Sequence, residues 1–109
     1  MDFDAAQLGK SMVAAARGSL GKDWKGARNF AEPELKRLAS VLVEIGERAV
    51  KGEITEDEAK ALLRIHCNTT ATVMLAVKGL GILAVENAVN AALGVVRDTV
   101  NTATGLMLL

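Results

Sequence analysis

The fold class follows from residues 32–51, which read EPELKRLASVLVEIGERAVK. Apolar residues recur in this segment at steps of three or four, which is the pattern of one buried face of an α-helix. The residues on that face are Leu35, Leu38, Ala39, Leu42, Ile45 and Ala49. Pro33 suits a first helical turn, where its missing N–H has no partner to lose, and Gly52 suits the residue just past a helix. The segment therefore predicts an amphipathic helix over 32–51.

A second helix is expected to begin directly after the first. Thr55 and Glu58 match the capping box, in which each side chain accepts the backbone N–H of the other residue. Glu56 and Asp57 add negative charge to the first turn, where the helix dipole favours it. Because only three residues separate the two segments, we expect an antiparallel helical hairpin.

Residues 1–30 predict a short helix followed by a connector. Apolar residues recur at helical spacing over about 4–17, and three glycines between residues 18 and 26 then weaken any continuation, at roughly 1 kcal/mol each. Trp24 and Phe30 lie in the connector. We expect both aromatic side chains to anchor it to the core; the alternative is a site on which a peptide or a nucleobase stacks.

The stretch after Thr55 has no proline and no clustered turn signal until about residue 103. It predicts one very long C-terminal helix over 55–104, within a single all-α domain of residues 1–109. At 1.5 Å per residue this helix is roughly 70 Å long, far beyond the radius of gyration of about 13 Å for a compact chain of this size. Weak helix formers at 68–72 and the glycines at Gly79–Gly81 leave three alternatives: a continuous helix, a kink, or a full break.

Charge is distributed unevenly along the chain. The first 60 residues hold 21 charged residues and the remaining 49 hold five. Ala71–Val85 contains Lys78 as its only charge, and a helix that is apolar all round is buried in a core, an oligomer or a membrane. A small hairpin offers too little surface to cover it, so we expect self-association into a homo-oligomeric helical bundle of the coiled-coil kind.

The expected oligomer interface uses the apolar positions of the long helix. These positions are Leu62, Ile65, Val73, Ala76, Leu80, Leu83, Val89, Leu93, Val96 and Val100. The tail, residues 106–109, is also apolar, and water would surround it unless it docked.

Composition excludes several classes of partner and site. The formal net charge is zero, whereas binding to nucleic acid needs a basic excess gathered on one face. A single cysteine, Cys67, rules out an internal disulfide and fits a reducing compartment. The N-terminus lacks a basic region followed by an apolar one, so a cytoplasmic location is expected.

No catalytic or cofactor-binding constellation appears in the sequence. His66 and Cys67 are adjacent, and adjacent helical residues point about 100° apart, so they cannot form a dyad or share a metal ion. The Glu-x-x-His motif of di-metal bundles is absent, because Leu63 stands three residues before His66. We expect no enzyme, no cofactor and no metal site. The one metal or pH-sensing candidate is His66, if symmetry brings several copies together.

The sequence therefore favours a self-associating structural or interaction protein, with itself as the partner. The alternative is an amphipathic helical protein that interacts with membranes, either at the lipid surface or as a pore. Ala71–Val85 is shorter than the roughly 20 residues needed to span a bilayer, and Lys78 lies inside it, which disfavours a simple spanning helix. This alternative therefore takes the form of peripheral insertion at the membrane surface, or of the release of a buried apolar hairpin onto lipid.

Overall fold

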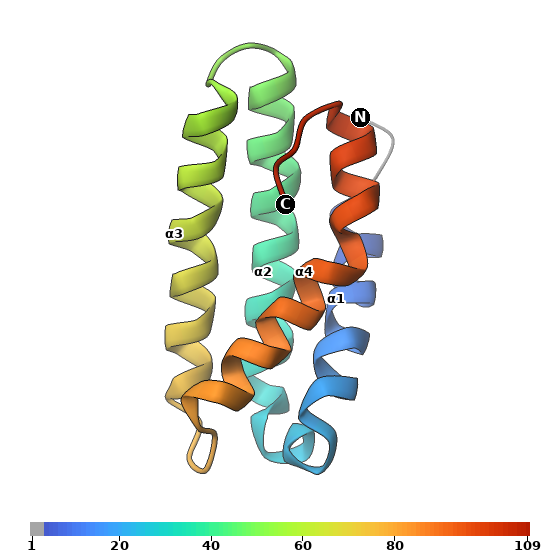
Figure 1. The fold of residues 1–109 in the computed structure, drawn as a ribbon. Coiled ribbons are helices and arrows are strands. Elements are labelled where there is room, and N and C mark those ends of the chain that lie inside the picture. The colour runs from blue at the N-terminus through green and yellow to red at the C-terminus, as the bar shows by residue number, and fades with distance from the viewer. Residues whose placement is uncertain (1–3) are drawn as a thin grey trace.

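The computed structural model describes residues 4–109, in which the chain forms four α-helices and no strand (Figure 1). In chain order the elements are α1 (Ala5–Leu20), the single 3₁₀ turn η1 (Gly21–Asp23), α2 (Trp24–Val50), α3 (Glu56–Leu75) and α4 (Ile82–Thr104). The bundle measures 42 × 22 × 18 Å, and its radius of gyration is 13.5 Å. The predicted all-α class is confirmed.

α2 is the longest helix, with 27 residues, and it begins at Trp24 rather than at the predicted residue 32. The predicted connector is therefore wrong, because most of it is helical. Trp24, Ala27 and Ala31 are buried and extend the stripe that continues through Leu35. Burial along this stripe outweighs the weak local propensity, so Pro33 lies inside the helix instead of in its first turn.

The two aromatic residues of this region have different environments. Trp24 is buried, as predicted, whereas Phe30 is 51% exposed and does not anchor the segment to the core. Phe30 directly precedes the buried Ala31, which places it about 100° around the helix from the buried stripe. Helical geometry therefore turns Phe30 towards solvent.

α2 and α3 form the predicted hairpin. Gly52 follows α2 with a positive φ of 75°, and the capping box at the start of α3 is complete. The Thr55 hydroxyl oxygen accepts the N–H of Glu58 at 3.0 Å, and the Glu58 carboxylate accepts the N–H of Thr55 at 2.9 Å. The hydrogen bond that the backbone N–H of Thr55 donates to the carboxylate, followed by the Thr55 side chain, lowers the pKa of Glu58 below its ordinary value.

Replacing Thr55 with alanine is expected to lower the free energy of unfolding by about 1 kcal/mol, because one backbone N–H of the first turn loses its acceptor. Chemical denaturation at pH 7 measures this loss.

Because the folded state lowers the pKa of Glu58, its carboxylate stabilises α3 above the ordinary pKa of glutamate. This stabilisation is lost as the pH falls through the pKa of Glu58 in the folded state. The opposite trend, with more stabilisation in acid, would contradict the observed cap.

The expected long C-terminal helix is wrong, because the chain breaks fully at residues 76–81 (Figure 1). Gly79 takes a left-handed φ of 93°, which a residue with a side chain rarely adopts. Gly81 is extended and caps the start of α4. The other suspected break, at 68–72, stays helical, with the Thr69 and Thr72 hydroxyls donating to carbonyls one turn earlier.

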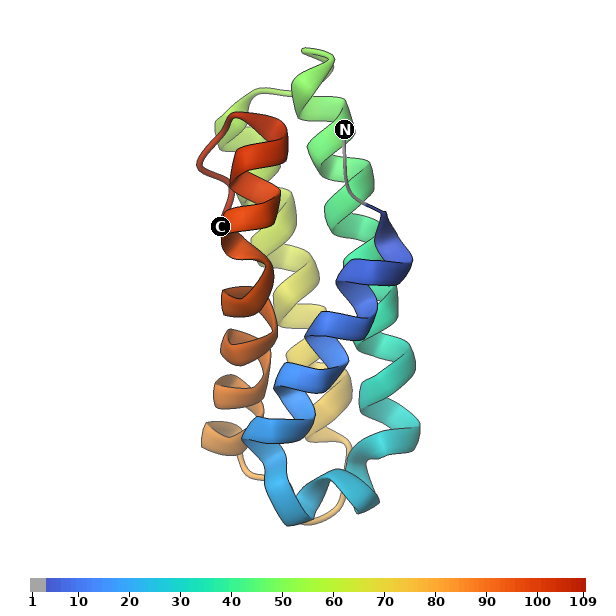
Figure 2. The same cartoon turned by 90° about the vertical axis from the view of Figure 1, so that its right-hand side faces the viewer.

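The break lets α4 fold back over the bundle. α4 crosses obliquely from the lower end of α3 and packs mainly against α1, as the two views together show (Figures 1 and 2). The accessible surface is 6209 Å², close to the roughly 5,800 Å² typical of a folded monomer of this mass. The chain therefore covers its own core, and burial of the apolar half does not by itself require other subunits.

The apolar tail docks on the bundle. The Asn101 side-chain oxygen accepts the N–H groups of Leu108 and Leu109, both at 3.0 Å, and its amide nitrogen donates to the Leu109 carbonyl at 3.2 Å. The N–H of Met107 donates to the Glu56 carboxylate at 2.8 Å. Leu108 is buried as a result.

Candidate interaction surfaces

The fold divides the predicted interface residues into three groups. Val89, Val96 and Val100 are buried in the chain's own core. Four are partly buried, namely Leu62, Val73, Leu80 and Leu93, and three are exposed, namely Ile65, Ala76 and Leu83. In this structure, only the exposed group is free to contact another molecule without a rearrangement of the core.

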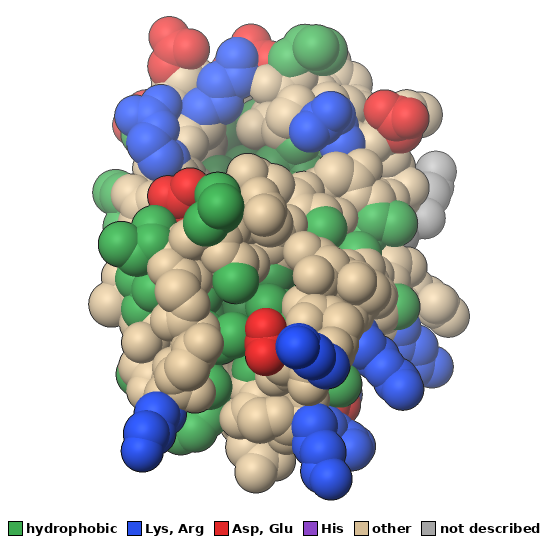
Figure 3. All heavy atoms as spheres, turned by 60° about the horizontal axis from the view of Figure 1, so that its bottom comes forward, with side chains coloured by type: hydrophobic (Ala, Val, Ile, Leu, Met, Phe, Trp, Pro, Cys, Tyr) green, Lys and Arg blue, Asp and Glu red, His purple; other side chains and the backbone are tan. Residues whose placement is uncertain are grey.

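Three large apolar side chains flank the turn between α3 and α4. Leu75 is 40% exposed, Ile82 is 64% exposed and Leu83 is 71% exposed. We call these three residues the turn patch. Figure 3 views the molecule from this end and shows hydrophobic side chains gathered on its left-hand side. The sequence prediction missed Leu75 and Ile82, because their exposure depends on the helix break that separates them.

Basic residues gather on the opposite side of the same end. An open groove of about 1120 Å³ lies between α1 and α2, with Trp24 among its lining residues. The cationic residues that line it are Lys10, Arg17, Lys25, Arg28 and Lys36. Residues 10–28 contain five cations and one acid, Asp23. The local count of charged residues in the sequence shows this excess, whereas the zero net charge of the whole chain does not.

Glu32 neutralises part of this basic surface. Its carboxylate accepts from Lys36 and from Arg28, both at 3.2 Å. These hydrogen bonds, from Lys36 first and Arg28 second, lower the pKa of Glu32. Lys10, Arg17 and Lys25 form no ion pair with a carboxylate in the described part of the chain.

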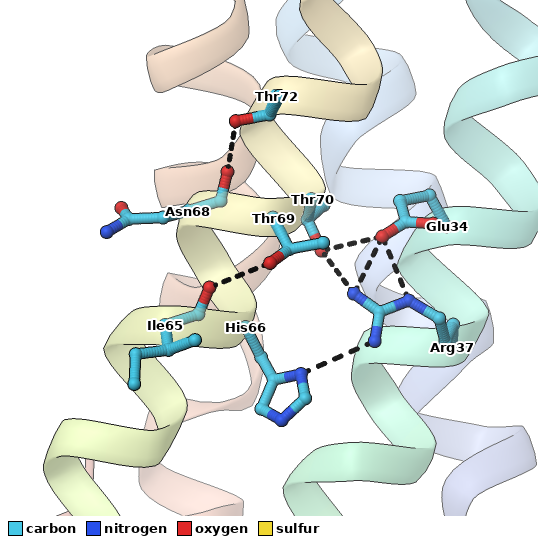
Figure 4. A network of polar contacts seen from close by, with 8 residues as sticks. All are labelled: Glu34, Arg37, Ile65, His66, Asn68, Thr69, Thr70 and Thr72. Atoms are coloured by element: carbon cyan, nitrogen blue, oxygen red, sulfur yellow. Dashed lines mark hydrogen bonds and ion pairs between the residues drawn. The ribbon is translucent and has the colours of Figure 1, made fainter.

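A polar network joins α2 to α3 around Thr70, which is fully buried (Figure 4). Arg37 donates to the Glu34 carboxylate at 2.7 and 2.9 Å, and the Thr70 hydroxyl donates to the same oxygen at 3.3 Å. The third guanidinium nitrogen of Arg37, Nη1, lies 3.4 Å from Nδ1 of His66. The network satisfies a buried hydroxyl and sets how the two helices align.

The contact with Arg37 bears on the His66 hypothesis. An arginine only donates hydrogen bonds, so Nδ1 of His66 acts as the acceptor in this arrangement. Only Nε2 of His66 then remains as a ligand for a metal ion, and the permanent positive charge of the neighbouring Arg37 would repel that ion. Within residues 4–109 no three His, Cys, Asp or Glu side chains converge where they could hold a metal.

Cys67 is partly buried, and burial raises the pKa of its thiol. Because the thiolate is the reactive form, we expect iodoacetamide to alkylate Cys67 more slowly in the folded protein than in denaturant at the same pH. Mass spectrometry at timed intervals measures the rate. As a control, Asn68→Cys in a Cys67→Ser background places the thiol at an exposed neighbouring position and should react faster. Equal rates for the two thiols would contradict the effect of burial.

None of the helices between residues 4 and 109 combines the length and apolar character that crossing a bilayer requires. Comparisons with protein-family models, curated protein sequences and solved structures found no match.

Proposed function

We propose that this chain is a self-associating helical protein with a structural or interaction role and no catalytic activity. The observation that carries the proposal is the turn patch, Leu75, Ile82 and Leu83, exposed beside the α3–α4 turn. Single exposed apolar residues are common on monomers, but several at one end of a bundle are typical of an interaction site.

The composition of the half of the chain that carries the turn patch supports this role. Only five charged residues occur in residues 61–109, the half of the chain that carries the patch. Depletion of charge is the compositional feature that distinguishes the centre of a protein interface from ordinary surface. Burying a fully exposed leucine or isoleucine contributes roughly 1.5–3 kcal/mol, so contact through these side chains favours association.

The mass of the protein in solution tests the proposal. Size-exclusion chromatography with light scattering, over a range of protein concentrations, should show a species heavier than the 11.4 kDa monomer. The double variant Ile82→Ser/Leu83→Ser should shift this species towards monomer. Val95→Ser is the matched control, because Val95 is 53% exposed on the same helix but lies away from the turn. A wild-type protein that stays monomeric at every concentration would refute self-association.

Peripheral binding to a lipid surface is a second candidate, which one observation favours. Lys78 lies in the turn between Leu75 and Ile82, and Lys22 lies in η1 at the same end of the bundle (Figure 1). Apolar side chains beside cations suit insertion into an anionic membrane surface. Flotation with vesicles of phosphatidylglycerol, and with phosphatidylcholine alone as control, tests this candidate. Absence of binding to both vesicle types would remove it.

A further inference from the structure

The two ends of the elongated bundle differ in charge. The turn end consists of residues 17–25 and 75–83, which hold four cations and one acid: Arg17, Lys22, Lys25, Lys78 and Asp23. The hairpin end consists of residues 47–58, which hold five carboxylates and two cations: Glu47, Glu53, Glu56, Asp57, Glu58, Arg48 and Lys51. Figure 1 shows η1 and the α3–α4 turn at the lower end and the α2–α3 loop at the upper end. The neutral chain is thus basic at one end and acidic at the other.

Both ends also expose apolar side chains. The turn end carries the turn patch. At the hairpin end Val50 is 51% exposed and Met107 is 68% exposed. The hydrogen bond from the N–H of Met107 to Glu56 places this residue beside the first turn of α3. Each end therefore combines an apolar contact surface with a net charge, which is positive at the turn end and negative at the hairpin end.

The charges at the turn end are available to a partner. None of its four cations forms an ion pair with a carboxylate in the part of the chain that the structure describes. At the hairpin end Arg48 and Glu53 approach each other at 3.7 Å, with both side chains substantially exposed, and Glu47 and Asp57 are exposed. Charges at this degree of exposure interact over about 8 Å at physiological salt, so they act across a direct contact.

We propose that copies of this chain associate head to tail, with the turn end of one copy against the hairpin end of the next. This inference rests on the proposed self-association and specifies its geometry. A symmetric contact between two turn ends would bury the same apolar patch but would oppose cations to cations. Contact between unlike ends pairs opposite charges instead. Such an interface joins two different surfaces, so it produces a closed ring or an open filament rather than a two-fold dimer.

Complementary charge reversal tests the geometry. Lys22→Glu/Lys25→Glu makes both ends acidic, and Glu47→Lys/Glu53→Lys makes both ends basic. Each variant alone should need at least about tenfold more protein to associate than the wild type, whereas an equimolar mixture should associate like the wild type. Arg64→Glu/Arg97→Glu is the control, because it changes the net charge as the first variant does but at exposed positions of α3 and α4 that lie outside the two ends and outside the basic groove. Circular dichroism verifies that each variant is folded.

The outcomes separate this inference from the proposed function. If neither charge reversal affects association but Ile82→Ser/Leu83→Ser abolishes it, the turn patch mediates association and the head-to-tail geometry is wrong. If the charge reversals abolish association, the mixture restores it and the serine variant has no effect, the geometry holds and the turn patch is not the contact. A mixture that stays monomeric overturns the inference. So does a monomeric wild type that binds anionic vesicles through its turn end.

Discussion

Replacing Leu38 with alanine is expected to lower the free energy of unfolding by about 2–5 kcal/mol. Leu38 has no exposed surface and is among the largest fully buried side chains. It lies on α2, which packs against every other helix of the bundle. Removing three carbon atoms there loses the transfer free energy of those atoms and leaves a cavity, because the surrounding helices relax only partly.

The loss is a large part of the total stability. Domains of this size unfold with about 5–15 kcal/mol, so the variant should melt roughly 10 °C or more below the wild type. Urea denaturation and thermal melting, both followed by circular dichroism, measure the two quantities. Leu83→Ala removes the same atoms from a side chain that is 71% exposed, and it should change stability by no more than about 0.5 kcal/mol. Similar losses at the two positions would show that α2 is not central to the core.

The second large effect is expected at Gly9, where α1 and α2 approach closely. A β-carbon at this position would lie 3.4 Å from Cγ of Lys36 and 3.7 Å from the β-carbon of Ala39. Leucine would extend three further carbons into this contact and force the two helices apart, which should cost about 1–3 kcal/mol. Alanine, in contrast, adds only the β-carbon at ordinary contact distance and removes the helix penalty of glycine. Gly9→Ala should therefore stabilise the protein by up to about 1 kcal/mol.

Other helical glycines provide matched controls for the opposite effects of alanine and leucine on stability at Gly9. A β-carbon at Gly26 in α2 or at Gly94 in α4 would meet no atom within 4 Å beyond the backbone of its own helix, and neither glycine has a positive φ. Both alanine and leucine should stabilise the helix there, because nothing opposes the added carbons. The measurement is the free energy of unfolding of the six variants. A stable Gly9→Leu protein would contradict the close packing of α1 on α2.

The local elements were predictable from the sequence because their causes are local. The 3.6-residue periodicity of Leu35, Leu38 and Leu42 specifies an α-helix whatever the helix packs against. The capping box of Thr55 and Glu58 depends on residues three apart. Both features appear in the structure as predicted.

The candidate surfaces were less predictable, because core and interface use the same apolar residues. Val96 and Leu83 were indistinguishable as members of an apolar helix, yet one is buried and the other is the most exposed residue of the turn patch. The segregated charge was also missed, since net charge sums over residues that the fold holds at opposite ends of a 42 Å bundle.

By itself, the sequence determined that the chain is helical, where α3 begins, and that its second half must be buried. Only the tertiary structure decided whether other subunits or the chain itself supply that burial. The choice was made at Gly79 and Gly81, where local propensity permits a turn without requiring one. The turn forms because it lets α4 return and bury Val85, Val96 and Val100 within its own chain. Packing between residues far apart in the sequence, which no local pattern records, outweighs the few helical hydrogen bonds that the break removes.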